Sequence, residues 1–452
     1  MDNKIRNSSD YSHCRPGVAD KLTTSVDAVE VARWQKQGRK TLGSALSSTR
    51  LQIERRTRQI YNLLTNEGFT AVADRVRAKA VDWIKPRKFT WEVRPEDVIA
   101  ADLERRPLNC LLPIVADQPI MINWVMVPAG PGSGGHTTIS RIIRYLQAKG
   151  HKNRVYFYDP YGGDQKYYEH LARQHYGITC EIGWVRNGMS DAHAVVATSW
   201  PSAYAVYNAG TAGKRFYFVQ DYEPYFYPVG TNSALAENTY RMGFHGITAG
   251  RWLADKLSRE FGMDTDSFPF GCDTARYHYE ASARRSGIAF YARPETPRRA
   301  VELGLLALEL FAKRQPGIEL HLFGTDMAGT SLKFIDHGVA SPEKLNDVYN
   351  SCRAGLALSL TNVSLVPHEM LACGCIPVVN DAGHNRMVLD NPYVRYAPLT
   401  PSGLAAALDD VVCAPDADAH SKRAAASVLT MSWDTAGAAV EEALYRSLLR
   451  AN

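Results

Sequence analysis

The sequence predicts an α/β protein with two parallel sheets in tandem and a mainly helical extension before them. Short apolar runs alternate with helical stretches from about residue 121 onward, which is the order of elements in a doubly wound parallel sheet. The same alternation starts again near residue 275, so a second sheet of this kind is expected after the first. A chain of 452 residues is long enough for two or three domains.

The first predicted sheet belongs to a Rossmann-like domain over residues 116–272. Its first strand is the apolar run Met121–Val127, which a glycine-rich turn and a helix over Thr138–Lys149 follow. The further expected strands are Val155–Tyr158, Ala194–Ala197, Arg215–Val219 and Gly246–Ala249.

The second predicted sheet belongs to a similar domain over residues 273–430, and a last helix lies in residues 431–452. Two such domains place a ligand cleft between them, at the carboxyl ends of their strands. The expected strands are Gly287–Tyr291, Glu319–Gly324, Ala354–Leu358 and Ile376–Val379, and the expected helices include Arg299–Lys313 and Val366–Cys373.

The N-terminal extension, residues 1–115, contains a helical pattern from Leu42 to about Ile84. We favour a helical cap that packs on the following domain, because Glu54 and Asp74 interrupt the positive charge of its polar face. The alternative is a basic surface for a membrane or a partner. The pattern consists of Arg50, Arg55, Arg56 and Arg58 on the basic side and Leu51, Ile60, Leu63 and Leu64 on the apolar side.

The composition excludes several classes of function. The net charge of +5 suits an anionic substrate or membrane surface, but it is too weak to indicate a nucleic-acid partner. No apolar run approaches the roughly 18–20 residues that span a bilayer, and the polar start of the chain lacks the apolar segment of a secretory signal. The eight cysteines have no zinc-binding spacing, so we expect reduced thiols, no metal and a cytoplasmic location. A peripheral contact with the inner face of the cell membrane stays open.

The first candidate ligand site is the glycine-rich turn Gly130–Thr137, which follows a strand and opens a helix. Gly134 and Gly135 allow close approach of a ligand, and the helix N-terminus offers free N–H groups to a diphosphate. The turn lacks the Gly-Lys-Ser/Thr of a nucleotide-binding P-loop, and Thr137 stands where a dinucleotide-binding motif has its third glycine. The alternative is a tight turn without a ligand.

The second candidate is a group of arginines at the end of a strand. Arg293 follows Gly287–Tyr291, and Arg298 and Arg299 begin the next helix. Cations there can neutralise a departing diphosphate, on which negative charge grows as the bond to the sugar breaks. Arg293 is the stronger candidate, and the alternative is a set of surface arginines that cap a loop.

The third candidate is the loop and helix after Ala354–Leu358. Backbone N–H groups in a loop of small residues can bind a second anion, and Glu369 in the following helix can accept hydrogen bonds from ribose or sugar hydroxyls. The alternative for Glu369 is an ordinary solvated side chain. The candidate loop residues are Thr361, Asn362, Ser364 and Leu365.

Together these segments resemble the retaining nucleotide-sugar glycosyltransferases of the GT-B fold that form glycosyltransferase family four. The resemblance covers about residues 120–450 and implies two Rossmann-like domains with an interdomain cleft, crossed by the last helix. The matching segments are Gly134-Gly135, Phe268-Pro269-Phe270-Gly271-Cys272-Asp273, Ala292-Arg293 with Arg298 or Arg299, Glu369 with Ala372-Cys373-Gly374-Cys375-Ile376-Pro377-Val378-Val379, and Ser432-Trp433.

The resemblance also implies a mechanism in which the sugar keeps its anomeric configuration and the leaving diphosphate helps to deprotonate the acceptor. Arg293, Arg298 and Arg299 would then stabilise the diphosphate, and Glu369 would hold the donor. No Asp-x-Asp metal motif lies near a strand end, so we expect activity without a divalent ion. Thr361 departs from the family pattern, because the first acidic residue of the family's pair falls there. An arginine also replaces the family's phosphate-binding lysine.

A narrower resemblance is to bacterial rhamnosyltransferases of surface-polysaccharide assembly. It implies dTDP-L-rhamnose as the donor and a growing surface glycan, with a lipid-linked one left open, as the acceptor. Asp221, a further catalytic candidate, would then lie on the acceptor side with Glu223 and His136. The alternative is a loop held by local Asx-type hydrogen bonds. The matching segments are Gly132-Ser133-Gly134-Gly135-His136, Val219-Gln220-Asp221-Tyr222-Glu223-Pro224, Phe290-Tyr291-Ala292-Arg293-Pro294 and Leu365 to Cys375.

Three other functions fit parts of the sequence. A nucleotide-sugar 2-epimerase of related fold would consume donor without an acceptor. An NAD(P) oxidoreductase would use the turn at Gly132–Thr137, against which the missing third glycine counts. A non-catalytic nucleotide-sugar-binding partner of a glycan synthase would explain Thr361.

Overall fold

A computed structural model describes residues 57–58, 61, 65, 68–84, 89–104, 110–115, 118–325 and 332–451. The chain divides into two compact units, residues 1–90 and 91–452, and each is described by itself. Among these residues, no helix is long and apolar enough to cross a membrane.

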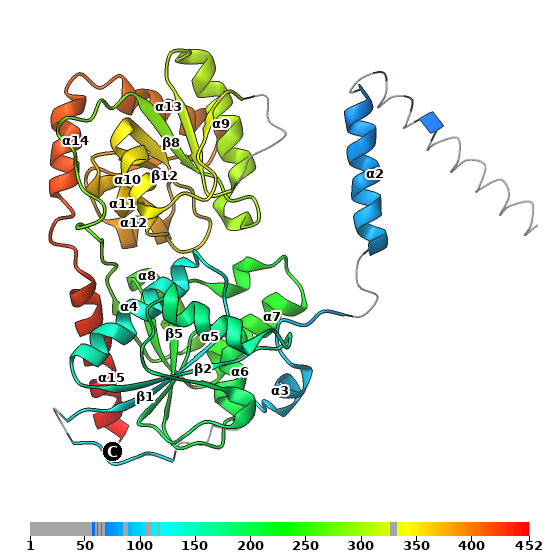
Figure 1. Cartoon of the computed structure of the whole chain (residues 1–452), viewed down its shortest axis with the longest axis vertical. Coiled ribbons are helices and arrows are strands. Elements are labelled where there is room, and N and C mark those ends of the chain that lie inside the picture. The colour runs from blue at the N-terminus through cyan, green and yellow to red at the C-terminus, as the bar shows by residue number, and fades with distance from the viewer. Residues whose placement is uncertain are drawn as a thin grey trace, which may run out of the picture. The chain divides into compact units, whose positions relative to one another are not determined.

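In the first unit, the described helix is α2 (Gly68–Ile84), labelled in Figure 1. It coincides with the end of the helical pattern expected up to Ile84, and its Phe69, Val76 and Val81 side chains are exposed. The choice between a cap and a binding surface stays a prediction. The expected positions Arg50, Leu51, Arg55, Arg56, Ile60, Leu63 and Leu64 lie outside the described residues.

The second unit contains two parallel sheets, which confirms the predicted fold class (Figure 1). The first sheet has the strand order β3-β2-β1-β4-β5-β6-β7, and every pairing in it is parallel. Its strands are β1 (Met121–Met126), β2 (Lys152–Phe157), β3 (Glu181–Trp184), β4 (Ala194–Ala197), β5 (Lys214–Val219), β6 (His245–Ala249) and β7 (Thr265–Phe268).

Helices alternate with these strands and complete the first domain. Residues 91–104 also belong to the same compact unit, since Val93 is fully buried and α3 contacts α6. The helices are α3 (Pro95–Ala100), α4 (Gly134–Ala148), α5 (Gln165–Gln174), α6 (Trp200–Asn208), α7 (Thr231–Asn238) and α8 (Arg251–Phe261).

The second domain is built on a parallel sheet with the order β10-β9-β8-β11-β12-β13. Its strands are β8 (Gly287–Tyr291), β9 (Leu320–Phe323), β10 (Ile335–Asp336), β11 (Cys352–Leu356), β12 (Ile376–Asn380) and β13 (Arg395–Ala397). Its helices are α9 (Val301–Arg314), α10 (Pro342–Ser351), α11 (Val366–Ala372), α12 (Gly383–Leu389), α13 (Pro401–Val412) and α14 (Ala417–Ala426).

The direction of winding reverses once in each sheet, between β1 and β4 in the first and between β8 and β11 in the second. Loops on the two sides of such a reversal turn away from each other, which opens a crevice at the carboxyl ends of the strands. The glycine-rich turn follows β1, the arginine loop follows β8, and the loop with Thr361 follows β11. The topology therefore places three of the predicted site segments at such crevices.

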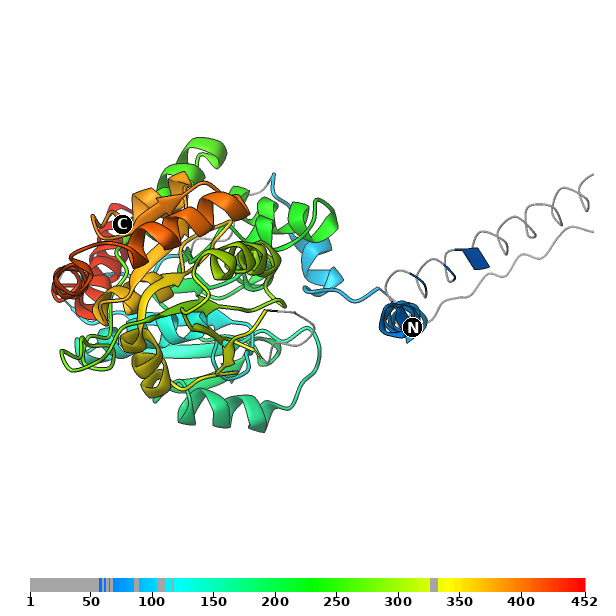
Figure 2. The ribbon, with the colours of Figure 1, turned by 90° about the horizontal axis from the view of Figure 1, so that it is seen from above.

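The last helix, α15 (Trp433–Ala451), returns to the first domain and contacts α4 and β7. Figures 1 and 2 show it in red along one side of the second unit. One apolar cluster runs from the first sheet through Phe270 and Cys272 into the second sheet and includes Leu444 of this helix. The two domains are therefore joined by packing as well as by the chain.

Several predicted boundaries were wrong, and the causes are local. Helix α4 begins at Gly134 rather than Thr138, because the Ser133 side chain caps it by accepting a hydrogen bond from the His136 N–H. The expected helix from Arg299 begins at Val301, after a 3-10 turn over Pro297–Arg299. The strands β3, β7, β10 and β13 were not predicted, since they are short and lie near or at sheet edges, where burial does not require an apolar run.

The packing of α9 on β8 gives a test of the second domain. A Cβ on Gly304 would lie 2.3 Å from Cζ of the fully buried Phe290 ring. Overpacking of this kind costs about 1–3 kcal/mol, against a gain of up to about 1 kcal/mol in helix propensity. We expect Gly304→Ala to lower the midpoint of thermal unfolding by about 2–4 °C. Gly317→Ala is the control, because nothing lies within 4 Å of its Cβ position; equal midpoints for both variants would contradict the packing.

Candidate functional site

Three segments that are far apart in the sequence meet at the carboxyl ends of the strands. The Gln220 side chain, just after β5, donates to the Gly135 carbonyl at the start of α4, at 3.2 Å. The Asn362 side chain, after β11, donates to the Gln220 carbonyl at 2.9 Å and to the Ala249 carbonyl at 2.9 Å. The glycine-rich turn, the end of β5 and the loop after β11 therefore form one continuous hydrogen-bonded site.

The glycine-rich turn has the backbone form that close approach requires. Gly132 has a φ of +80°, a left-handed conformation that favours glycine. A Cβ on Gly135 would lie 3.3 Å from the Gln220 amide nitrogen, so a larger residue would push this side chain away. Gly134 and Gly135 form the first turn of α4, where N–H groups have no partner in the helix and can bind an anion.

Asp221 lies at the centre of the contact between the two domains. Its Oδ1 accepts a hydrogen bond from the Asn362 N–H at 2.8 Å, and its Oδ2 accepts one from the Thr361 hydroxyl at 3.0 Å. Arg298 Nε lies 3.3 Å from the same Oδ2, which makes an ion pair although the angle does not suit a hydrogen bond. Thr361 and Asn362 are each 1% exposed. These two predicted donor contacts are thus occupied by the first domain.

The three predicted arginines have different surroundings. Arg299 is buried and donates to the Ser359 hydroxyl at 2.9 Å. Arg298 is ion-paired with Asp221, and its guanidinium lies 4.0 Å from the centre of the Phe226 ring. The Arg293 side chain is 38% exposed and pairs with the exposed Glu295 at 2.9 Å. Of the three, Arg293 therefore has a guanidinium that a soluble anion can reach.

Glu369 lies on α11 and faces groups from both domains. The Tyr349 hydroxyl donates to its Oε2 at 3.4 Å. Burial raises the pKa of this carboxyl to about 7, and the positive charge of Arg141 on α4 opposes the rise. Arg141 lies 3.4 Å from the Asp273 carboxylate and stacks 4.6 Å from the Trp433 ring centre. A carboxyl that is part ionised at neutral pH can accept hydrogen bonds from ribose or sugar hydroxyls.

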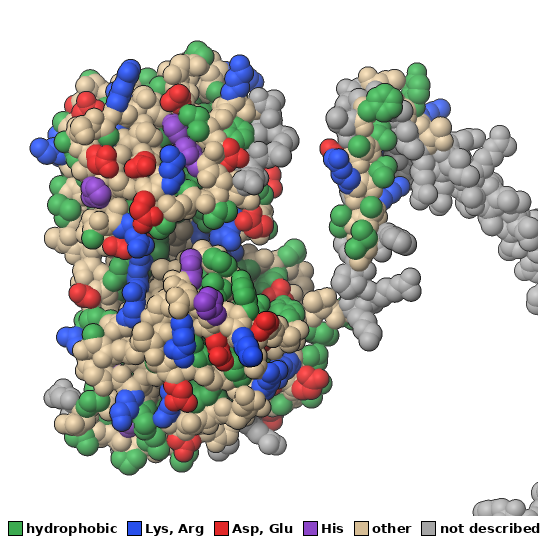
Figure 3. Space-filling model, viewed as in Figure 1, with side chains coloured by type: hydrophobic (Ala, Val, Ile, Leu, Met, Phe, Trp, Pro, Cys, Tyr) green, Lys and Arg blue, Asp and Glu red, His purple; other side chains and the backbone are tan. Residues whose placement is uncertain are grey.

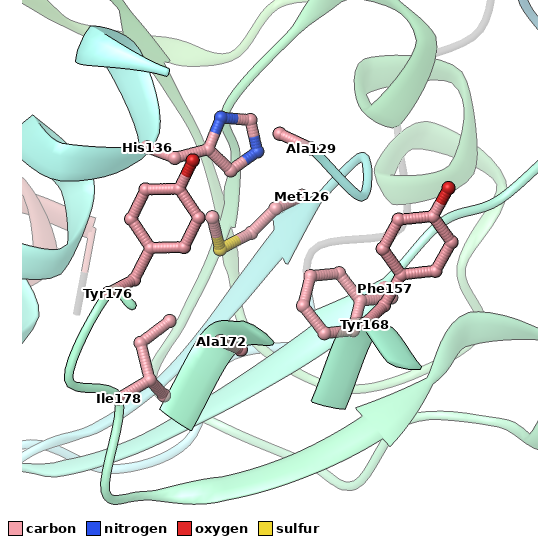
Figure 4. Close-up of a pocket in the computed structure, with 8 residues that line it drawn as sticks. All are labelled: Met126, Ala129, His136, Phe157, Tyr168, Ala172, Tyr176 and Ile178. Carbon is pink, nitrogen blue, oxygen red and sulfur yellow. The ribbon is translucent and has the colours of Figure 1, made fainter. Parts of the chain in front are cut away.

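His136 is fixed within the first domain. Its Nε2 lies 2.8 Å from the Val127 carbonyl, its Nδ1 lies 2.9 Å from the Ser133 hydroxyl, and burial lowers the pKa of the ring. The ring lines a cavity of about 10 Å³, about the room that a single water needs, beside Tyr168 and Tyr176 (Figure 4). Both ring nitrogens are engaged, so the structure does not direct either of them at an acceptor.

Glu223 faces the interior of the first domain. Its carboxyl is 6% exposed and accepts hydrogen bonds from the Trp200 N–H at 2.7 Å and the Tyr217 hydroxyl at 3.1 Å. Burial raises the pKa of this carboxyl to about 8. Its predicted place on the acceptor side is not what the structure shows, because the run after β5 turns into a 3-10 helix that directs residue 223 inward.

The remaining predicted residues, Ser364 and Leu365, lie where the loop after β11 enters α11, and both are partly exposed. In Figure 3, the surface between the two domains is hollowed and Lys or Arg side chains lie along the hollow. Among the described residues, no group of three or more His, Cys, Asp or Glu side chains is placed to hold a metal ion.

Two contributors to the site were not predicted, Gln220 and Arg141. Gln220 directly precedes Asp221 after a strand, and this position is a signal that could have identified it. Arg141 lies inside the amphipathic helix α4, where an arginine is ordinary, so no local signal distinguishes it. Its partners Asp273 and Trp433 come from the link between the sheets and from α15.

Comparison with known sequences gives two family models and one curated relative. Residues 188–249 match the model described as "WsaF, N-terminal domain", and residues 286–409 match "WsaF, C-terminal domain". The "O-antigen biosynthesis protein RfbC" of Myxococcus xanthus is 37% identical over 226 residues. The match covers 48% of this chain and 18% of the relative, so the chain spans less than a fifth of that protein.

Comparison with solved structures confirms the GT-B architecture. TarM superposes with a TM-score of 0.60 at 9% identity, over 74% of this chain and 99% of that one. The pneumococcal O-GlcNAc transferase GtfA in complex with UDP and GlcNAc has a TM-score of 0.59 at 9% identity, over 73% and 99%. A putative UDP-N-acetylglucosamine 2-epimerase from Listeria monocytogenes has a TM-score of 0.50 at 10% identity, over 74% and 98%. At these identities the likeness is one of fold alone.

The buried Glu223 predicts a dependence of stability on pH. The pKa of its carboxyl is higher in the folded protein, about 8, than the ordinary value of 4.5, so the folded state binds more protons between these values. Its contribution to stability therefore falls as the pH rises from about 4.5 to 8. Glu223→Gln keeps an uncharged partner for Trp200 and Tyr217, so we expect its stability relative to the unchanged protein to increase over this range.

The expected increase in the unfolding free energy of Glu223→Gln, relative to the unchanged protein, is on the order of a few kcal/mol, since one pKa unit corresponds to about 1.4 kcal/mol. Denaturant unfolding of both proteins at pH 5.5 and pH 8.5 measures it, because groups common to both cancel in the difference. A difference in unfolding free energy that is the same at both pH values would show that Glu223 is not perturbed by burial.

Proposed function

We propose that this protein is a retaining glycosyltransferase of family four that transfers L-rhamnose from dTDP-L-rhamnose to a growing surface glycan. The observation that carries the proposal is the meeting of the Gly134-Gly135 turn, the end of β5 and the loop after β11 at the carboxyl ends of two Rossmann-like sheets. The name of the RfbC relative, an O-antigen biosynthesis protein, supports a surface glycan as the acceptor. The complex of GtfA with UDP and GlcNAc, which has the same fold, supports a nucleotide-sugar donor.

In the proposed reaction, an acceptor hydroxyl oxygen bonds to C1 of the sugar as the bond from C1 to the diphosphate oxygen breaks. The acceptor proton passes to the leaving diphosphate, and dTDP and the extended glycan are released. The residues of the chain orient the two substrates and stabilise the leaving charge. No step requires a divalent ion, so transfer should persist in EDTA.

The role that we propose for each site residue follows from how accessible its side chain or backbone is to a ligand. The Arg293 guanidinium is accessible and follows β8 at the strand reversal, so it would pair with the diphosphate. The first-turn N–H groups of α4 and the backbone of residues 364–365 would bind the phosphate oxygens. Glu369 would accept hydrogen bonds from the ribose. A glycan acceptor, lipid-linked or free, would enter the site from the side of the first domain. The protein would act in the cytoplasm, near the inner face of the membrane.

A second candidate function is a nucleotide-sugar epimerase. The Listeria 2-epimerase fold favours it, because the same two-domain architecture extends to that class. An epimerase converts its donor without an acceptor, so donor conversion in the absence of any glycan would distinguish it from a transferase.

The proposed donor can be tested by a thermal-shift panel of dTDP-rhamnose, UDP-glucose and GDP-mannose. A ligand at 100 times its dissociation constant stabilises the folded state by about 2.7 kcal/mol, so the correct donor should raise the unfolding midpoint most. We expect that donor to be dTDP-rhamnose. A larger shift with UDP-glucose or GDP-mannose would refute the rhamnose assignment, and no shift with any nucleotide sugar would refute the proposed function.

Replacement of Arg293 tests the diphosphate site. We expect Arg293→Ala to reduce transfer by 100-fold or more, on the order of the loss of one charge-stabilising donor, while the unfolding midpoint stays unchanged. Arg423→Ala is a matched control, since Arg423 is also exposed and pairs with Asp416 at 2.8 Å, but it lies on α14. Initial rates with saturating donor measure both. Near-normal turnover in Arg293→Ala would remove this residue from the site.

A further inference from the structure

We infer that Asp221 is a positioning residue that supplies, from the first domain, a carboxylate that organises the donor-binding loops of the second domain. This inference rests on the proposed function, because it concerns the donor subsite of the same site. Under this inference, a single negative charge can come from either residue 221 or residue 361. Donor binding then depends on contact between the two domains.

The contacts of Asp221 are mostly with the second domain. Thr361, Asn362 and Arg298 approach its carboxylate at 3.0, 2.8 and 3.3 Å, whereas within its own domain the carboxylate accepts from the Tyr222 N–H at 2.9 Å. A side chain that served only the loop after β5 would bond within that loop. The carboxylate of Asp221 instead fixes a neighbouring pair of residues after β11 and a cation after β8.

The two loops of the second domain are also tied to each other. The Leu360 N–H donates to the Arg298 carbonyl at 2.9 Å, and Arg299 donates to the Ser359 hydroxyl at 2.9 Å. A group that holds Arg298 therefore also holds the loop after β11. Phe226 adds to this anchor, because its ring lies 4.0 Å below the Arg298 guanidinium and also belongs to the first domain.

The short distance between the side chains of residues 221 and 361 favours a neutral residue at position 361. The side chain of Asp221 is 13% exposed and that of Arg298 is 25% exposed, so the ion pair is poorly screened by water. A carboxylate at position 361 would lie within hydrogen-bond distance of Asp221, and two ionised carboxylates at this separation repel each other strongly. The threonine hydroxyl instead donates to Asp221. In the proposed arrangement, one carboxylate at this point, from either residue, holds Arg298.

A carboxylate relocation tests the inference. We expect Asp221→Asn to raise the KM for the donor by about 10-fold or more, with a smaller change in kcat, since the uncharged amide no longer pairs with Arg298 and its NH2 cannot accept from the Thr361 hydroxyl. Thr361→Glu alone should also raise this KM, because it places two carboxylates together. The double variant Asp221→Asn/Thr361→Glu should return the KM to within about 3-fold of the unchanged protein, because the charge now comes from position 361.

Asp191 provides a matched control. Its Oδ1 accepts from the Thr211 hydroxyl at 3.0 Å and from the Ala212 N–H at 2.7 Å. These are the same kinds of partner as at Asp221, a threonine hydroxyl and the N–H of the next residue, but both belong to the first domain. We expect Asp191→Asn to leave the donor KM unchanged. An unchanged KM in Asp221→Asn, or a double variant no better than either single one, would overturn the inference.

A second readout needs no donor and separates this inference from the proposed function. Hydrogen exchange of the peptide that contains residues 359–365 should be faster in Asp221→Asn than in the unchanged protein, because the amide NH2 can neither accept from the Thr361 hydroxyl nor pair with Arg298, which loosens this loop. The same peptide should be unaffected in Asp191→Asn. Equal exchange in all three proteins would overturn the inference even if sugar transfer is observed. Faster exchange in Asp221→Asn, together with no donor binding by the unchanged protein, would support the contact of Asp221 with this loop and refute the proposed function.

Discussion

The contact of the Asp221 carboxylate with Thr361, Asn362 and Arg298 is the interaction on which the shape of the candidate site depends. It connects the end of a strand in one sheet to two loops of the other, and those loops are also bonded to each other. The remaining site groups are arranged around this point. Arg293 is accessible, because its side chain is 38% exposed and its ion-pair partner Glu295 is exposed as well.

The three acidic side chains proposed from the sequence have different physical roles. Asp221 is paired with a cation and accepts from N–H and O–H donors of the second domain. Glu369 is largely buried on α11, and this burial raises the pKa of its carboxyl to about 7. Glu223 is held inside the first domain by Trp200 and Tyr217, so its contribution is to stability.

The sequence predicted the two sheets and the segments of the site, because apolar runs and glycine-rich turns are local patterns. It did not predict edge strands such as β7, whose sequence Thr265–Phe268 has a single fully apolar residue. It named Arg293 as the stronger candidate, but only the folded chain gives the physical reason, which is that Asp221 and Phe226 occupy the guanidinium of Arg298. Contacts between domains depend on orientation, and neither periodicity nor spacing encodes it. The donor, its stereochemistry and the acceptor stay predictions.

The return of α15 to the first domain has a consequence for how firmly the site must be held. Because the chain passes between the domains at residues 269–286 and again before Trp433, their facing loops are held at a high effective concentration. A small number of hydrogen bonds and one ion pair, such as those of Asp221, are then sufficient to keep the loops together. The second connection thus lowers the entropy cost of bringing the facing loops of the two domains together.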